Sequence, residues 1–135
     1  MSGIRAKDTK PEIAIRRALH RLGFRYRLHS RKLPGCPDLV LPRYRALVFV
    51  HGCFWHGHSC PYFKLPSSRP EFWRAKIERN RENDAKHRQA LLDQGWRVAT
   101  VWECATRGKM ADVDRVAASL AEWFTGESPN IEIRQ

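Results

Sequence analysis

The chain has 135 residues, which is enough for one domain built around a single hydrophobic core. Hydrophobic residues make up 42% and charged residues 29% of it, which argues against wholesale disorder. Lys and Arg number 25 against 14 Asp and Glu, a formal net charge of +11, and a domain this basic usually binds a polyanion, most often nucleic acid. The longest uncharged apolar stretch, residues 46–55, is too short to span a membrane, and the first 30 residues lack a signal-peptide pattern. We therefore expect a cytoplasmic protein with no membrane contact.

The first half of the chain predicts one helix followed by three strands. The helix begins near Thr9, carries apolar residues at helical spacing through Leu22 and stops at Gly23. Apolar and basic residues alternate over residues 24–28, which is the period of a half-buried strand. A rigid turn at residues 34–37 leads into a second strand over 38–41. After another turn, the continuous apolar run 46–50 predicts a central strand covered on both faces.

The second half predicts a long helix, a strand and a last helix. The long helix runs from Pro70 to about Gln94 and is closed by Gly95, and a strand follows over 96–102. Asp112 is expected to cap the last helix, and the polar tail 127–135 is expected to be loosely held. The order α-β-β-β-α-β-α indicates a single α/β domain over residues 1–135, with a mixed sheet flanked by helices.

Histidine and cysteine are concentrated in residues 51–60, which read His-Gly-Cys-Phe-Trp-His-Gly-His-Ser-Cys. A structural Zn²⁺ site needs four thiolate or imidazole ligands. The ligand set that we predict is Cys53, His58, Cys60 and, from beyond the strand that ends at Trp102, Cys104. The alternative is a histidine-rich loop with two buried thiols. Cys36 has no evident partner and is interpreted as a free thiol.

Two histidines and three carboxylates remain as candidates for chemistry. His51 and His56 flank the predicted zinc loop, and imidazole has the pKa best suited to proton transfer near neutrality. Asp38 precedes an apolar strand, where an ionised carboxylate is costly unless it binds a cation. Glu12 also fits a capping box with Thr9, and Asp84 also fits a solvated helix face. Together the three carboxylates could converge on a hard cation such as Mg²⁺.

Aromatic residues near the zinc loop offer a further function. Phe54 and Trp55 lie inside the loop, and Trp73 lies at the start of the long helix. The core is the default place for a tryptophan, but apolar wedges beside a basic surface also unstack and kink DNA. Both interpretations remain open for these three residues.

Several of these segments together resemble the very short patch repair endonuclease (Vsr) family. The resemblance covers roughly residues 4–125 and is carried by residues 34–38, 49–60, 71–73, 80–84 and 95–104. It implies a restriction-endonuclease-like core and a strand-specific endonuclease that nicks 5′ of the T in a T:G mismatch. Such mismatches arise when 5-methylcytosine deaminates, and the nick starts very short patch repair. Residues 1–8 would be a truncated form of the family's DNA-contacting N-terminal arm.

The resemblance also implies a role for each candidate residue. Asp38 and the carbonyl of Val50 would bind Mg²⁺, His56 would be the general base, and His51 would support the scissile phosphate. Glu12 and Asp84 would be the outer acidic residues that hold water and the base in place. The structural zinc site would comprise Cys53, His58, Cys60 and Cys104, and the wedge beside the mismatch would comprise Phe54, Trp55 and Trp73.

The expected partner is double-stranded DNA with a T:G mismatch, bound by a monomer that associates with the nucleoid and is recruited by mismatch-repair proteins. One rival interpretation is a relative that cuts at a different lesion or acts as a homing-type endonuclease. Another is a zinc-stabilised DNA-binding module without catalysis. One experiment separates an endonuclease from a DNA-binding module. Replacement of Asp38 abolishes the product of an endonuclease while DNA binding remains, whereas a binding module forms no product in the first place.

Overall fold

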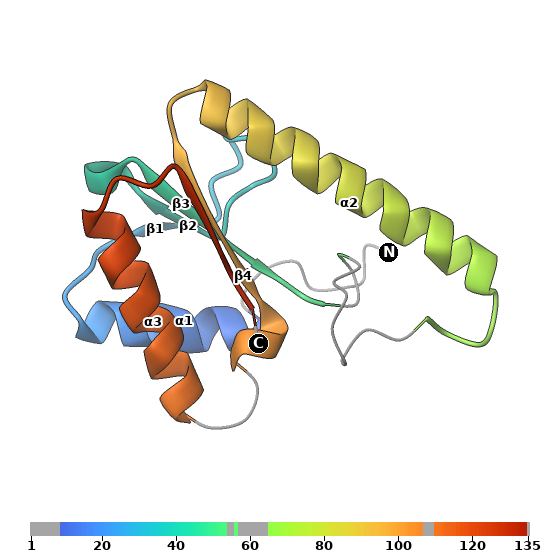
Figure 1. Ribbon diagram of the computed structural model, residues 1–135, viewed down its shortest axis with the longest axis horizontal. Coiled ribbons are helices and arrows are strands. Elements are labelled where there is room, and N and C mark those ends of the chain that lie inside the picture. The colour runs from blue at the N-terminus through green and yellow to red at the C-terminus, as the bar shows by residue number, and fades with distance from the viewer. Residues whose placement is uncertain (1–8, 54–55, 57–64, 107–109, 135) are drawn as a thin grey trace.

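A computed structural model describes residues 9–53, 56, 65–106 and 110–134 (Figure 1). Residues 1–8, the predicted arm, therefore lie outside the described part of the chain. The described elements are α1 (Lys10–Arg21), β1 (Arg27–Leu28), β2 (Leu39–Leu41), η1 (Pro42–Tyr44), β3 (Ala46–His51), α2 (Pro70–Asp93), β4 (Arg97–Trp102), η2 (Glu103–Thr106), α3 (Met110–Thr125) and β5 (Asn130–Ile133). Within the described residues, no helix is both long and apolar enough to cross a membrane.

The strands form one mixed sheet in the order β1-β2-β3-β4-β5. The first three strands pair antiparallel, and β3, β4 and β5 pair parallel. The fold is therefore α/β with a mixed sheet, as the order of elements predicted. The register between β3 and β4 places His51 opposite Trp102 at the carboxyl ends of both strands.

Helices cover both faces of the sheet, with α1 and α3 on one side and α2 on the other (Figure 1). The larger core cluster joins apolar residues of α1 and α3 to one face of the sheet, including Leu19, Val48 and Phe124. A smaller cluster joins Leu91 of α2 to the opposite face. Because β3 is covered on both sides, its residues are almost continuously apolar, which explains the uninterrupted run in the sequence.

Helix boundaries agree with the capping signals in the sequence. Thr9 is the N-cap of α1, and its side chain accepts the backbone N–H of Glu12 at 3.4 Å. Gly23 and Gly95 follow α1 and α2 with φ angles of +96° and +90°, where a side chain would be strained. The predicted cap of the last helix is wrong, because α3 begins at Met110 and Asp112 lies in its first turn.

Two strand predictions also need correction. The strand expected over 24–28 pairs only at Arg27 and Leu28, because Phe24 and Tyr26 pack against the larger core cluster outside the ladder. The tail is not loosely held, since residues Asn130–Ile133 form β5 along β4. Ile131 and Ile133 pack against the core in alternation with exposed residues, so this short segment buries enough apolar surface to join the sheet.

Candidate active site

Asp38 lies directly before β2 and is 7% exposed. Its backbone N–H donates to the carbonyl of Val48 at 3.0 Å. Its carboxylate accepts the backbone N–H of Val50 at 2.7 Å. The antiparallel pairing of β2 with β3 thus holds this side chain against Val50, near the end of β3.

Glu12 brings a second carboxylate to the same place from α1. Its side chain is 1% exposed, and its Oε2 accepts from Arg16 Nη1 at 3.1 Å, one turn along the helix. The same oxygen lies 2.5 Å from Nε2 of His29. A hydrogen bond also links the carboxyl groups of Glu12 and Asp38. Thr9 caps the helix as the sequence suggested, while the Glu12 carboxylate lies in this buried group.

Burial raises the pKa of Asp38 to about 7. The hydrogen bond from Val50 and the charge of Arg16 oppose this rise, and the neighbouring carboxylate of Glu12 adds to it. Two adjacent buried carboxylates are costly in their ionised form unless a cation balances them. This donor set fits a divalent cation, because carboxylate and carbonyl oxygens are the ligands that hard ions such as Mg²⁺ prefer.

His51, at the end of β3, belongs to a second group with His56 and Asp84. The two imidazole rings are parallel, with centroids 3.8 Å apart. Asp84 reaches the group from the middle of α2, and its Oδ2 lies 2.5 Å from Nδ1 of His56. The alternative in which Asp84 lies on a solvated face of the helix is therefore wrong. It also does not join the other two carboxylates, so the expected convergence of all three on one cation is wrong.

The two histidines differ in their surroundings. His51 is 8% exposed, and burial together with the charge of His56 lowers its pKa to about 3. Its buried Nδ1 has no hydrogen-bond partner among the described residues, so a second ring proton would add an unsatisfied donor. The side chain of His56 is 26% exposed, and its backbone N–H donates to the carbonyl of Gly52 at 3.2 Å. His51 is thus a neutral imidazole, and His56 is the more accessible of the two.

Asp84 is the charged partner in this second group. Burial raises its pKa, but the hydrogen bond from His56 and the nearby His51 and His87 outweigh burial, so that its pKa lies below the ordinary value. An ionised Asp84 accepts the proton on Nδ1 of His56. This contact leaves Nε2 of His56 as the nitrogen that can exchange a proton with another group.

The two groups are connected through β3. Val50 donates its N–H to Asp38, and the next residue is His51. Consecutive residues of one strand therefore connect a pair of carboxylates to a pair of histidines. A site of this kind offers both an oxygen-lined position for a cation and a neutral imidazole for proton transfer.

Two of the four predicted zinc ligands are described, and they lie in one cluster. Cys53 is 0% exposed and Cys104 is 2% exposed, and both pack with Trp102. The backbone N–H of Cys53 donates to the side chain of Glu103 at 3.3 Å. His58 and Cys60 lie outside the described residues. The fold thus brings together the first and last ligands of the predicted set from segments about fifty residues apart.

Of the three predicted wedge residues, Phe54 and Trp55 lie outside the described part of the chain. Trp73 lies in the first turn of α2, and its ring meets that of Phe72 edge to face, with centroids 5.2 Å apart. Phe72 is 46% exposed, and the guanidinium of Arg69 lies 4.6 Å from its ring centroid. Phe72 was not singled out from the sequence, although its place beside Trp73 was visible there.

His29 is the residue of the site that the sequence did not reveal. It has a φ of +46°, and its backbone N–H donates to the carbonyl of Asp38 at 3.1 Å. A lone histidine in a basic loop carries no spacing signal. Cys36, by contrast, is a free thiol as interpreted from the sequence, and it is exposed.

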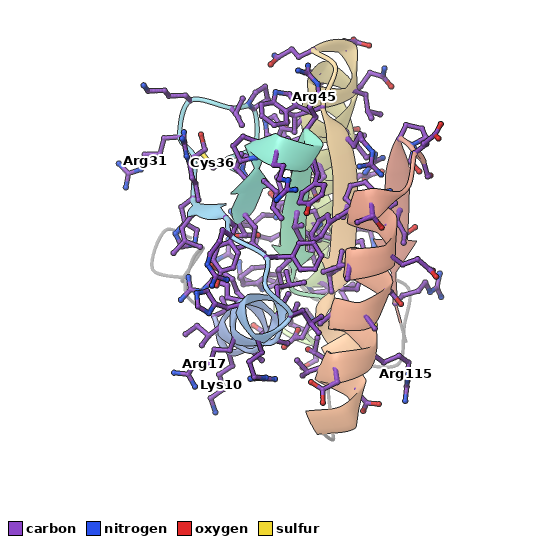
Figure 2. The ribbon with its side chains drawn as sticks, turned by 90° about the vertical axis from the view of Figure 1, so that its left-hand side faces the viewer. Lys10, Arg17, Arg31, Cys36, Arg45 and Arg115 are labelled. Carbon is purple, nitrogen blue, oxygen red and sulfur yellow. The ribbon has the colours of Figure 1, made fainter. Side chains whose placement is uncertain are left out.

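Basic side chains extend outward from the side of the molecule that carries α1. In Figure 2, Lys10 and Arg17 on this helix and Arg31 on the loop before β2 point away from the body on the same side. The exposed Cys36 lies on the same loop. This surface has the positive charge that binding to a phosphate backbone requires.

Comparisons with known proteins identify relatives along almost the whole chain. Residues 1–62 match the model of the family described as DNA mismatch endonuclease Vsr. The type II nicking enzyme V.XorIIP of Xanthomonas oryzae pv. oryzae is 48% identical over 89% of this chain and 85% of its own length. DNA mismatch endonuclease Vsr of Escherichia coli is 42% identical over 98% of this chain and 86% of its own. The type II nicking enzyme V.NmeAIP of Neisseria meningitidis is 45% identical over 90% and 87%. The chain therefore belongs to the Vsr family of DNA mismatch endonucleases, which are hydrolases acting on DNA.

Proposed function

We propose that this chain is a strand-specific, Mg²⁺-dependent endonuclease that nicks DNA 5′ of the T in a T:G mismatch. The mismatch arises from deamination of 5-methylcytosine, and the nick starts very short patch repair. The observation that carries the proposal is that Asp38 accepts the backbone N–H of Val50 and that His51 is the next residue of β3. Relatives named as a mismatch endonuclease and as nicking enzymes support the same reaction class.

Asp38 and the carbonyl of Val50 would hold the Mg²⁺ ion, and Glu12 would hold water beside it. When bound, the ion supplies positive charge that stabilises the phosphorane-like transition state and the leaving oxygen. The two carboxylates themselves supply the negative, desolvated surroundings in which that cation is favoured. Arg16 offsets part of the charge of Glu12 and leaves Asp38 as the more available ligand.

His56 would act as the general base. Asp84 holds Nδ1 of His56, so Nε2 takes a proton from a water molecule whose oxygen attacks the scissile phosphorus. The bond between phosphorus and O3′ breaks, and the proton stays on the imidazole until solvent removes it. His51 would donate a hydrogen bond to the same phosphate as a neutral ring, and its parallel contact with His56 fixes the orientation of the base.

The remaining residues would recognise the DNA and stabilise the site. Phe54, Trp55 and Trp73 would insert beside the mismatch, because a T:G pair costs less to unstack than a matched pair. Basic residues of α1 and the following loop would bind backbone phosphates. Structural zinc bound by Cys53, His58, Cys60 and Cys104 would hold the loop that carries His56.

The experiment that tests this function uses duplexes labelled on each strand. We expect one nick, on the T strand of a T:G duplex, with Mg²⁺ and none with a chelator. Matched and abasic duplexes of the same sequence test the rival lesions, since equal cutting of either would contradict mismatch specificity. Asp38→Ala should bind the duplex without nicking it, whereas a DNA-binding module would give no product with either protein.

A further inference from the structure

His29 completes a group of three possible metal ligands with Glu12 and Asp38. The ligand atoms of these three side chains all lie within 4.8 Å of one another. Ligands about 2.1 Å from one ion span roughly 4 Å across it, so this group is close to the size that a single ion requires. The group draws on three separate segments: α1, the turn after β1 and the start of β2.

The backbone directs His29 into this group. The residue adopts a left-handed conformation, with φ of +46°, and its N–H donates to the carbonyl of Asp38. Its side chain is 18% exposed, and its Nε2 lies 2.5 Å from Glu12 Oε2. The same carboxylate oxygen also accepts from Arg16, and the second carboxylate is that of Asp38. The imidazole nitrogen thus faces two buried carboxylates and only one guanidinium.

We propose that His29 is a nitrogen ligand of the divalent ion held by Asp38, and that the site therefore selects Mn²⁺ over Mg²⁺. The inference rests on the proposed metal site and adds a ligand and a metal preference to it. Mg²⁺ strongly prefers oxygen ligands, whereas first-row transition metals bind imidazole well. An imidazole added to the oxygen ligands from Asp38 and Val50 thus shifts relative affinity toward the transition metal. Mg²⁺ still supports nicking through these oxygen ligands at higher concentration.

Pulsed electron paramagnetic resonance of bound Mn²⁺ detects such a ligand directly. We expect nitrogen modulation of the electron spin echo in the wild-type protein, and a change in its frequencies when the histidines are labelled with ¹⁵N. The modulation should be lost in His29→Gln and kept in His20→Gln, a matched variant at an exposed position of α1. Absence of modulation in the wild type, or modulation that persists in His29→Gln, overturns the proposal.

Calorimetric titration with Mn²⁺ and with Mg²⁺ gives the metal preference. We expect wild-type protein to bind Mn²⁺ at least tenfold more tightly than Mg²⁺, with the advantage reduced about tenfold or more in His29→Gln. The glutamine amide can still donate to Glu12, so an equal loss for both metals assigns His29 to positioning alone and overturns the proposal. His29→Asn serves as a second variant, because asparagine tolerates the left-handed conformation.

These outcomes separate the inference from the proposed function. Nicking with Mg²⁺ and no preference for Mn²⁺ overturns the role of His29 and leaves the endonuclease intact. Failure of both ions to bind wild-type protein, while Asp38→Asn behaves identically, overturns the metal site itself. Thermal unfolding of each variant without added Mg²⁺ or Mn²⁺ shows that the fold is retained, so that lost metal affinity reports on the ligand.

Discussion

The imidazole rings of His51 and His56 lie parallel, with an interplanar angle of 7° and centroids 3.8 Å apart. One ring belongs to a residue of a paired strand, so the contact holds the ring of His56 against the end of the sheet. Trp102 meets His51 edge to face at 5.3 Å and completes the support. The neutral state of His51 is needed here, because two stacked imidazolium ions would repel each other.

Asp38→Asn should stabilise the metal-free protein at pH 8 while it abolishes nicking. The folded-state pKa, about 7, lies above the ordinary 3.8, so the folded protein binds this proton more tightly than the unfolded chain. The resulting stability is present below pH 4 and is lost as the pH rises through 7. Asparagine removes the buried charge, and we expect a gain of roughly 1–3 kcal/mol in the free energy of unfolding at pH 8.

Urea unfolding without added Mg²⁺ at pH 4 and pH 8 measures this difference, with Asp93→Asn at the exposed end of α2 as the control. The control should change the free energy of unfolding little at either pH. A variant less stable than wild type at pH 8 would show that the carboxylate is stabilised in its ionised form without a cation.

His51→Gln should reduce the loss in the free energy of unfolding as the pH falls below neutrality. The pKa of His51, about 3, lies below its ordinary 6.5. Between these two pH values the unfolded chain therefore binds a proton at this residue and the folded protein does not. Stability from this residue is present above pH 6.5 and is lost as the pH falls toward 3, by up to about 1.4 kcal/mol per pH unit. A glutamine side chain does not titrate in this pH range, so the variant lacks this contribution to the pH dependence. Unfolding between pH 7 and 4 tests this, and His20→Gln should keep the wild-type slope.

Asp84→Asn should slow nicking by roughly 10- to 100-fold and leave DNA affinity unchanged, because general bases contribute about 10²–10⁴ and the variant misorients the base rather than removing it. Asparagine can present its amide group to Nδ1 of His56 and so reverse the tautomer. Single-turnover rates on a T:G duplex across pH 6–9 measure the effect. Glu82→Gln, an exposed acid on the same helix, is the matched control. Equal rates in both variants would remove Asp84 from the mechanism.

Cys104→Ser should lower the zinc content of the purified protein from about one ion per chain to near zero. The variant should also unfold at a lower temperature, since structural zinc contributes folding energy. Cys36→Ser changes an exposed thiol and should keep both the zinc and the melting temperature. Metal analysis measures the zinc content, and thermal unfolding measures the melting temperature. Full zinc content in Cys104→Ser would place the fourth ligand elsewhere.

Trp73→Ala should weaken binding to a T:G duplex by roughly 1–3 kcal/mol, the usual contribution of an aromatic ring stacked on a base. Binding to a matched duplex should weaken less, because the ring inserts only where the pair opens. Leu22→Ala removes a side chain that is 54% exposed on α1 and serves as the control. Equal losses for the two duplexes would contradict a wedge. Fluorescence anisotropy at fixed salt measures both affinities.

Local signals in the sequence were sufficient for much of the fold. Pro70 and Gly95 delimit α2 because proline suits the first helical turn and glycine suits the residue after the last. Asp38 stood out because a charge beside an apolar strand needs a compensating group. His29 gave no such signal, since only the turn after β1 and the pairing of β2 bring it to Glu12. Contacts between segments that are distant in the sequence leave no pattern in the residues around His29.

β5 also connects the C-terminal segment of the chain to the candidate active site. Glu132 accepts the indole N–H of Trp102 at 2.5 Å, and Trp102 packs against His51 and clusters with the buried Cys53 and Cys104. A fusion partner or affinity tag placed after Gln135 therefore starts two residues beyond a strand that braces the reaction centre. A tag placed there is therefore expected to perturb the candidate site, and preparations intended for kinetic comparison are better made without one.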